Sequence, residues 1–467
     1  MLGYKQTEVG VIPDKWDVKP LGELFSFRNG VNADKNSYGR GIRFINVLEP
    51  ITYSHLYGPE ITGRVSLPES VAASFTVRRG DVLFNRTSET QEEVGMAATF
   101  LGEERVMFGG FVIRGRPLSI NLDPTYSGYA LRAPFIRSQI IPLGQGAIRA
   151  NIGQQNLSLV LVPVPPIFEQ RAIATALNDV DALLGGLDRL IAKKRDLKQA
   201  TMQQLLTGQT RLTGFHAEWM VRRLGDIGEI SSAGVDKKVL PDEVRVRLVN
   251  YLDVYRRDFI YSKDLTHWVT APPQQAMRCA VQKGDIFFTP TSETRDDIGI
   301  STVAMEDIPD AAYSYHVTRL RLYEHWDLRF RTYAFKTRAF LDQAQTLCDG
   351  NGTRYVISQG KFRSMKVKVP PFLEQSAIGE VLTAMDAELT ALEERRIKTH
   401  ALKQAMMQEL LTGRTRLLSL VAETKTGVKR RATMPNLNPK CFSIRPWLAA
   451  QMCGAVSRTR RGGRTSG

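Results

Sequence analysis

The sequence contains few of the residues, and none of the motifs, from which common catalytic centres are built. Its four cysteines, Cys279, Cys348, Cys441 and Cys453, show no CxxC spacing, so we expect free thiols in a reducing compartment and neither a zinc site nor a disulfide framework. The six histidines form no HExxH or H-x₃-H pair, and no GxxxxGK[ST] loop for a nucleoside triphosphate occurs. We therefore predict a non-catalytic chain that binds no metal and no cofactor of its own.

Long apolar runs are also missing. No run of 18 apolar residues occurs and the N-terminus MLGYKQTEVG is polar, so we predict no membrane span, no signal peptide and a cytoplasmic location. A methyltransferase acting on a DNA amino group would show an Asn/Asp/Ser-Pro-Pro-aromatic motif. The nearest match is Val369-Pro370-Pro371-Phe372, and valine cannot accept the hydrogen bond that the motif provides.

The net charge of +15 is unevenly distributed. Residues 424–467 hold ten Lys or Arg and no Asp or Glu, which leaves +5 for the first 423 residues. We expect residues 418–467 to form a basic, largely disordered tail. Two roles remain open for it, non-specific affinity for phosphates and a solvated appendage without a specific role.

The chain contains two copies of one long stretch. Shifting residues 165–212 by 205 positions places them on residues 370–417 without a gap, and 25 of the 48 positions are identical. Identity at that level indicates an internal duplication.

Each copy is expected to form one long helix. Paired prolines suit its start, and Thr207-Gly208 and Thr412-Gly413 suit its end. Apolar residues recur with a period of 3.5, typical of a coiled-coil seam. The seam residues are Ile173, Leu177, Val180, Leu184, Leu187 and Ile191 in the first copy, and Ile378, Leu382, Met385, Leu389 and Leu392 in the second. We predict two antiparallel rods of roughly 60 Å, at ~1.5 Å per residue.

A diverged globular module precedes each rod. Short matching segments, such as VRRGDVLFNRTSET (77–90) and VQKGDIFFTPTSET (281–294), recur at offsets of 203 to 205. Short β-type runs separated by turns, with helices expected over 128–140 and 327–345, predict α+β modules with an antiparallel or mixed sheet. The expected domains are a first module within 1–160, a helix within 161–212, a second module within 213–366, a helix within 367–417, and the tail 418–467.

Polar residues at matching places in the two modules suggest recognition of DNA. Hydroxyls, amides and guanidinium groups at strand ends can reach phosphates or base edges. The alternative is a polar turn kept for folding, and an exposed arginine is individually more often just solvated. The candidates are Asn85, Arg86, Thr87, Ser88, Arg114, Arg116, Arg149 and Asn151 in the first module, and Thr289, Thr291, Ser292, Arg319, Arg321 and Arg354 in the second.

The sequence resembles the specificity subunits of type I restriction-modification systems. The resemblance is carried by the opening YKQTEVGVIPDKWDVKPLGEL (4–24), by both PPxxEQxxI…LLTGxTRL rods, and by the GD-[IV]-[LF]-F segments that begin at Gly80 and Gly284. It covers nearly all of residues 1–417 in the family's order, with the same twofold repeat. The basic tail lies outside it.

The resemblance implies two target recognition domains, each reading half of a split, asymmetric sequence of double-stranded DNA, separated by two long antiparallel coiled-coil helices. It further implies two methyltransferase subunits docked on the helices, with motor-nuclease subunits joining for cleavage. Those partners are expected to use S-adenosylmethionine, ATP and Mg²⁺, whereas this subunit is not expected to catalyse a reaction. Two alternatives are the recognition subunit of a type IIB-like system and a non-catalytic coiled-coil adaptor that binds something other than DNA.

Overall fold

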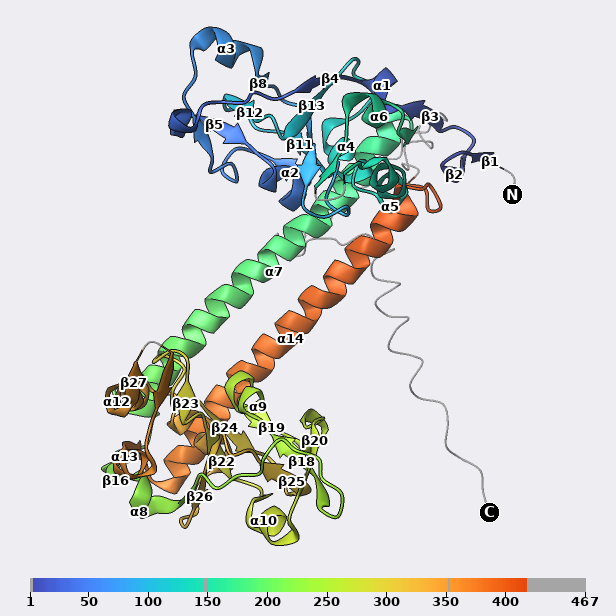
Figure 1. Cartoon of the computed structure of the whole chain (residues 1–467). Coiled ribbons are helices and arrows are strands. Elements are labelled where there is room, and N and C mark those ends of the chain that lie inside the picture. Colours follow the sequence, from blue (N-terminus) through green and yellow to red (C-terminus); the bar gives the residue numbers. More distant parts are fainter. Residues whose placement is uncertain (1–2, 147–148, 352, 418–467) are drawn as a thin grey trace, which may run out of the picture. The chain divides into compact units, whose positions relative to one another are not determined.

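The computed structural model describes residues 3–146, 149–351 and 353–417. The predicted tail lies outside these residues. The described part consists of two modules of matching topology and two long helices, α7 and α14 (Figure 1). None of the described helices contains an apolar stretch that could span a membrane.

The two long helices begin after the paired prolines, as predicted; α7 ends at the predicted Thr207, and α14 ends at Leu410, two residues before the predicted Thr412. Helix α7 (Ile167–Thr207) follows Pro166, and α14 (Phe372–Leu410) follows Pro371. Gly208 ends α7 in the left-handed region at φ 72°, where a side chain would strain the backbone. The lengths of 41 and 39 residues correspond to roughly 60 Å each.

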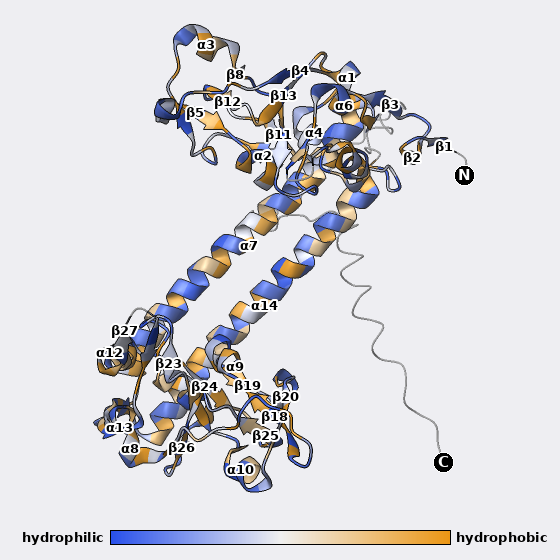
Figure 2. Ribbon diagram, viewed as in Figure 1, coloured by the Kyte–Doolittle hydropathy of each residue, from blue (hydrophilic) through white to orange (hydrophobic). Residues whose placement is uncertain are grey.

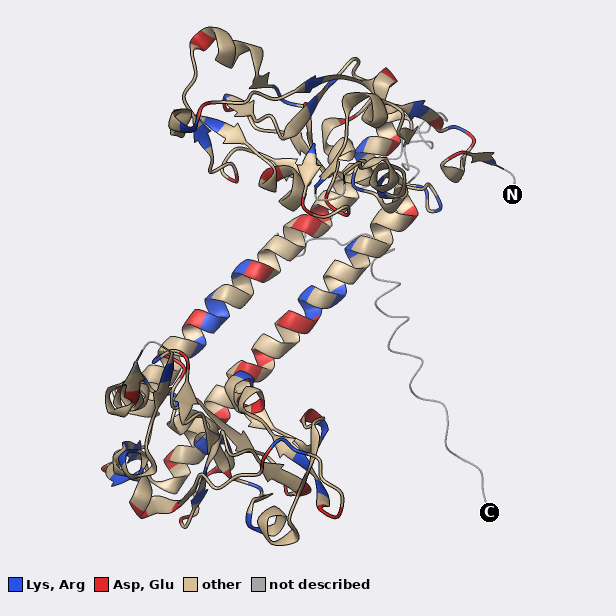
Figure 3. Ribbon diagram, viewed as in Figure 1, with Lys and Arg blue, Asp and Glu red and all other residues tan. Residues whose placement is uncertain are grey.

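The two helices pack against each other in antiparallel orientation, which confirms the prediction. Lys403 near the end of α14 pairs with Asp181 near the start of α7, and Lys198 pairs with Asp386 at the other end. Figure 2 shows polar and apolar residues alternating along both helices, and Figure 3 shows charges of both signs in their middle parts.

Module 1 is built on two mixed sheets. The five-stranded sheet consists, in spatial order, of β4 (Phe25–Asn29), β13 (Val112–Pro117), β9 (Val82–Asn85), β11 (Ala97–Phe100) and β6 (His55–Leu56). The four-stranded sheet consists of β7 (Arg64–Val65), β5 (Tyr38–Ile45), β12 (Val106–Phe108) and β8 (Thr76–Val77). Strand pairs β11–β6 and β12–β5 are parallel, and the other pairs of these sheets are antiparallel. The predicted mixed sheet is therefore present.

Short strand pairs and helices complete module 1. The pairs are β1 (Tyr4–Thr7) with β2 (Gly10–Pro13), β3 (Asp17–Pro20) with β15 (Leu161–Val164), and β10 (Thr87–Ser88) with β14 (Ala150–Asn151). The α-helices are α1 (Leu21–Leu24), α2 (Leu48–Thr52), α3 (Glu69–Ser74), α4 (Pro124–Ala130), α5 (Pro134–Ile140) and α6 (Gln154–Ser158). Two 3₁₀ turns lie at Lys35–Ser37 and Ile141–Leu143.

Module 2 repeats this plan with the same strand order. Its five-stranded sheet consists of β17 (Gly228–Ser231), β26 (Thr318–Leu322), β22 (Ile286–Phe288), β24 (Ser301–Ala304) and β19 (Phe259–Ile260). Its four-stranded sheet consists of β20 (Trp268–Ala271), β18 (Val244–Val249), β25 (Ile308–Tyr313) and β21 (Ala280–Val281). The small sheets are β16 (Met220–Arg223) with β29 (Lys366–Val369), and β23 (Thr291–Ser292) with β28 (Arg354–Val356) and β27 (Asp349–Asn351).

The helices of module 2 correct one prediction. They are α8 (Leu224–Ile227), α9 (Tyr251–Arg256), α10 (Pro273–Arg278), α11 (Leu328–Ala334), α12 (Arg338–Leu347) and α13 (Gln359–Ser364), with a 3₁₀ turn at Ser262–Asp264. The single helices expected over 128–140 and 327–345 are each two helices. Pro134 begins α5 and cannot continue α4, and the Thr337 side chain caps the start of α12.

The ends of the long helices belong to the module cores. Ile173, Leu177 and Val180 of α7 lie in the same buried cluster as Met406 and Leu410 of α14, together with the module 1 core. A second cluster joins Met202 and Leu205 of α7 and Ile378 and Leu382 of α14 to the module 2 core. Modules 1 and 2 therefore sit at opposite ends of the helix pair, each anchored to both helices.

Candidate nucleic-acid interface

In module 1, a polar loop and a β-strand far along the chain meet at one edge. Strand β10 follows β9 directly and pairs with β14 in the register Thr87↔Asn151. The Thr87 hydroxyl donates to the Asn151 side-chain oxygen over 2.6 Å. Arg149 and Asn151 are exposed, whereas Arg86 and Thr87 are half-buried. The structure thus brings four of the predicted residues together.

Module 2 presents the same arrangement. Strand β23 pairs with β28 in the register Thr291↔Val356 and Ser292↔Tyr355. Thr291 and Ser292 are half-buried, and Arg354 is exposed on the same strand pair. Each module therefore carries a surface, which we call the loop–hairpin surface. It is formed by residues 86–97 with 145–146 and 149–151 in module 1, and by residues 290–300 with 349–351 and 353–356 in module 2.

Three other predicted residues hold this loop from inside. Asn85 is buried and donates through its side chain to the Glu93 carbonyl over 3.1 Å. The buried Thr289 hydroxyl donates to the Asp297 carbonyl over 2.9 Å at the matching place. Ser88 is buried too and donates to the Glu93 carboxylate over 2.8 Å. These hydrogen bonds favour the folding role that was left open for the polar residues, and their part in recognition stays a prediction.

Two predicted arginines neutralise buried carboxylates. The Asp285 side chain is 1% exposed, and Arg321 donates to both of its oxygens over 2.7 Å. Arg116 forms the matching fork on Asp81, with distances of 2.9 and 2.7 Å. These hydrogen bonds raise the pKa of both guanidinium groups. A buried carboxylate needs such a partner because its desolvation is costly.

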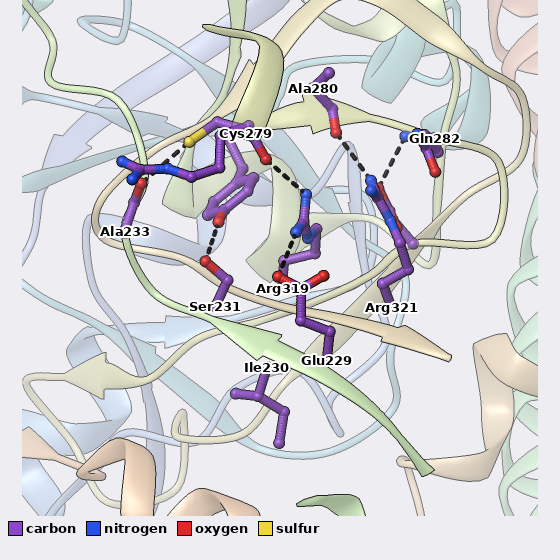
Figure 4. A network of polar contacts seen from close by, with 12 residues as sticks. Glu229, Ile230, Ser231, Ala233, Cys279, Ala280, Gln282, Arg319 and Arg321 are labelled. Atoms are coloured by element: carbon purple, nitrogen blue, oxygen red, sulfur yellow. Dashed lines mark hydrogen bonds and ion pairs between the residues drawn. The ribbon is translucent and has the colours of Figure 1, made fainter. Parts of the chain in front are cut away.

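The two neighbouring arginines, Arg114 and Arg319, are buried, whereas Arg116 and Arg321 are half-buried. Arg319 donates to the Arg278 carbonyl over 3.1 Å and lies beside Arg321 on β26, with Glu229 close by (Figure 4). Arg114 is 7% exposed and lies against the Phe108 ring, and burial lowers the pKa of its guanidinium. These contacts favour a folding role for the four arginines, and a part in binding DNA stays a prediction for the cluster.

Helices α7 and α14 make the same contacts at their starts, with equivalent residues of the two copies. Glu169 at the start of α7 is fully buried, and it accepts from Trp16 Nε1 over 3.0 Å and from Arg416 Nη2 over 2.8 Å. Glu374 at the start of α14 accepts from Trp219 Nε1 over 2.9 Å and from both Arg211 nitrogens.

The same reciprocity holds further along the helices. Tyr129 donates to Asp181, which pairs with Lys403, and Tyr333 donates to Asp386, which pairs with Lys198. Asp181 and Asp386 are equivalent positions of the two copies, and so are Lys198 and Lys403. Each aspartate therefore pairs with the lysine of the other copy. This is the signature of a twofold relation between the two halves.

Most of the predicted seam residues are buried, and the others are half-buried. Buried seam residues are Ile173, Leu177, Val180, Leu187 and Ile191 on α7, and Ile378, Leu382 and Leu389 on α14, whereas Leu184, Met385 and Leu392 are half-buried. The middle of the pair is also cross-linked by charge, through Lys194–Glu388, Arg195–Glu393 and Asp188–Arg396.

Sequence reasoning missed the buried glutamates and a second apolar stripe. Glu169 and Glu374 are among the positions identical in both copies, which was the available signal. Leu183, Leu190 and Leu197 of α7 are 38, 39 and 50% exposed. Their spacing of seven places them on one face of the helix, and this face remains open to solvent.

Comparison with known proteins agrees with this architecture. Residues 216–400 match the type I restriction modification DNA specificity domain. The putative type I restriction enzyme MjaX specificity subunit of Methanocaldococcus jannaschii is 23% identical over 428 residues, which cover 89% of this chain and 97% of that protein. The EcoKI specificity subunit of Escherichia coli K12 is 21% identical over 390 residues, covering 79% and 82%. Residues 216–400 thus match the DNA specificity domain of type I systems, and most of the chain is similar to type I specificity subunits.

A solved structure from a study of complex assembly and conformational transition of the type I R-M system has the same fold. The TM-score is 0.54 at 16% identity, and the match covers 86% of this chain and 99% of that chain. This structure shows the shared fold, and the matched DNA specificity domain with the aligned relatives supplies the role, that of the DNA specificity subunit of a type I restriction-modification system. That subunit is the recognition subunit of the complex and not the subunit that carries out its chemistry.

Proposed function

We propose that each module reads one half of a bipartite, asymmetric DNA target, and that α7 and α14 set the distance between the halves. The observation that carries the proposal is the reciprocal contact pattern, in which Glu169–Arg416 and Glu374–Arg211 fix the two modules in equivalent positions at opposite ends of one helix pair. Equivalent positions related by a twofold favour half-sites read in opposite orientations.

The helix pair supports a spacing of about one DNA turn. Between the two module cores, α7 runs from Val180 to Met202, a difference of 22 residues, and α14 runs from Leu382 to Met406, a difference of 24. At ~1.5 Å per residue this is roughly 33–36 Å, which matches the rise of one turn of B-DNA. The full helix length overstates the spacing because the helix ends are buried in the modules.

The DNA-facing residues are proposed to lie on the two loop–hairpin surfaces. Arg86, Thr87, Arg149 and Asn151 in module 1 have donors or acceptors that reach the surface, as do Thr291, Ser292 and Arg354 in module 2. Arginine and asparagine can each form two hydrogen bonds to one base edge, and both can reach phosphates.

The partners are proposed from the same architecture. A twofold specificity subunit suits two methyltransferase subunits, one for each half-site, joined by motor-nuclease subunits when the complex cuts. The exposed stripe of Leu183, Leu190 and Leu197 offers a methyltransferase subunit an apolar helix face on which to dock. S-adenosylmethionine, ATP and Mg²⁺ would be bound by those partners. A cytoplasmic location, where the DNA is, goes with this assignment.

A module replacement tests the proposal. The chain is co-expressed with the methyltransferase subunit of its system, and methylated adenines are mapped across the host genome. The unmodified chain should give a split motif with two different halves. Replacing residues 217–366 by a second copy of residues 14–160 should make the halves identical and inverted. A motif that stays asymmetric would show that the modules do not read the half-sites.

A further inference from the structure

One loop is preserved in both modules although the modules around it have diverged. Residues 87–95 read TSETQEEVG, and residues 291–299 read TSETRDDIG. Five of the nine positions are identical, and three others differ only within a chemical class. The exception is a glutamine in module 1, Gln91, where module 2 has an arginine, Arg295.

The two loops are held by matching hydrogen bonds. Thr90 N–H donates to Ser88 Oγ over 3.3 Å, and Thr294 N–H donates to Ser292 Oγ over 3.2 Å. The closing glycines also match. Gly95 N–H donates to the Asn85 carbonyl over 2.7 Å and Gly299 N–H to the Thr289 carbonyl over 2.9 Å. Both glycines have positive φ, 65° and 80°, so the two loops close with the same backbone conformation.

The differing side chains are at the surface of this shared frame. Gln91 and Arg295 are both exposed. The Arg295 guanidinium carbon lies 5.0 Å from the centre of the Tyr355 ring, a stacking contact that limits the arginine's rotamers before it meets a ligand. The equivalent of Tyr355 in the strand register is Ala150. The residue that pairs with the loop serine therefore differs between the modules, as the residue at position 91 or 295 does.

The charges of the loop argue against a phosphate clamp. Glu89 and Glu92 are exposed in module 1, and Glu293 and Asp296 are exposed in module 2. Carboxylates repel the DNA backbone, but they can accept from cytosine N4 in the major groove. A loop that changes its chemical class at only one position is suited to a shared docking mode in which a different base is read on each side.

We propose that position 91 and its equivalent 295 each read a base edge, with Gln91 recognising adenine in one half-site and Arg295 recognising guanine in the other. A glutamine amide matches adenine N6 and N7, and an arginine fork matches guanine O6 and N7. Tyr355 is a positioning residue that holds the Arg295 fork. This inference rests on the proposed function, since it presumes that each module reads a half-site.

The test is the methylated motif of complexes containing Arg295→Gln, Arg295→Ala and Gln91→Arg. Arg295→Gln should lower methylation of the original sites by about 10- to 100-fold and shift one guanine of a single half-site towards adenine, while the other half-site stays unchanged. Gln91→Arg should change the other half-site in the opposite direction. Arg295→Ala should relax that one position, whereas loss of a phosphate contact would weaken methylation at all sequences alike.

Two further readouts keep this inference separate from the proposed function. If the unmodified complex methylates a split motif and all three variants keep that motif, the assignment of positions 91 and 295 is wrong while the half-site reading stands. If the unmodified complex gives no split motif, the proposed function itself fails. Assembly with the methyltransferase subunit is measured by size-exclusion chromatography. A variant that stays folded but no longer assembles with the methyltransferase subunit would make the loop a protein-docking site, which also overturns the inference.

Discussion

The buried glutamate at the start of α7 provides a sharp test of how the modules are fixed to the spacer. Glu169→Gln keeps the shape of the side chain but removes the charge. In the folded protein this carboxylate is 0% exposed and accepts from Trp16 and from both ends of the Arg416 fork. The substitution leaves a guanidinium and an indole N–H facing a neutral amide that has only one acceptor oxygen.

The expected loss can be worked from these contacts. Hydrogen bonds to a charged group contribute about 1.5–3 kcal/mol each, and breaking a buried pair costs about 3–5 kcal/mol. The glutamine retains one acceptor, and the Arg416 side chain is 19% exposed and so keeps some access to water. We therefore expect the free energy of local opening at this end of the helix pair to fall by about 2–3 kcal/mol. The equilibrium constant for that opening would then rise by about 30- to 150-fold.

Amide hydrogen exchange followed by mass spectrometry localises the effect. Protection should fall by about that factor in peptides covering the first turns of α7 and the last turns of α14, because local opening there becomes easier. The matched variant Glu374→Gln should act at the opposite end, where Arg211 and Trp219 take the equivalent roles. If either single variant lost protection equally at both ends, or lost none, the two glutamates would not each anchor one end of the helix pair.

Three other predictions follow from the same contacts. Inserting seven residues after Ile191 and seven after Leu392 keeps the register of the helix pair and lengthens each helix by about 10.5 Å. The unspecified gap in the methylated motif should then grow by about 3 base pairs. An unchanged gap would show that the helices do not set the spacing. Arg321→Ala should lower the melting temperature because it leaves the buried Asp285 unpaired. Arg354→Ala should leave the melting temperature unchanged and weaken DNA binding. If Arg354→Ala lowered the melting temperature and Arg321→Ala weakened only DNA binding, the folding role of Arg321 and the DNA-binding role of Arg354 would both be wrong. Burial lowers the pKa of His55 below 6.5, so the unfolded state binds more protons below pH 6.5; the stability of module 1 should be complete above pH 6.5 and fall as the pH drops towards the folded pKa. His55→Gln should flatten that dependence in urea titrations, and an unchanged slope would rule out this histidine.

The comparison of prediction and structure separates local from long-range information. The long helices could be predicted because their signals lie within one stretch of chain: prolines at the start, a 3.5-residue apolar period and a terminal glycine such as Gly208. Their antiparallel pairing followed from the duplication and the length of chain between the copies. The expected helices over 128–140 and 327–345 were wrong because Pro134 and Thr337 each start a new helix.

The candidate site divides in the same way. The polar loop after β9 and the residues around Asn151 were identifiable from composition, but their pairing across more than 60 positions of sequence (Thr87↔Asn151) depends on the folded sheet. Nothing in the pattern Thr318-Arg319-Leu320-Arg321 indicates whether an arginine meets solvent or a carboxylate. The partner of Arg321 is Asp285, 36 residues away on the neighbouring segment.

The sequence by itself determined the duplication, the two rods, the mixed α+β modules and the family to which they point, because periodicity and repetition are properties of neighbouring residues and of aligned copies. Only the tertiary structure decided which charged groups are paired inside the folded protein and which face the solvent. A charge is free or paired according to what lies opposite it after folding, and in this protein the deciding partners come from the other copy, as Glu169 does for Arg416, or from a distant strand.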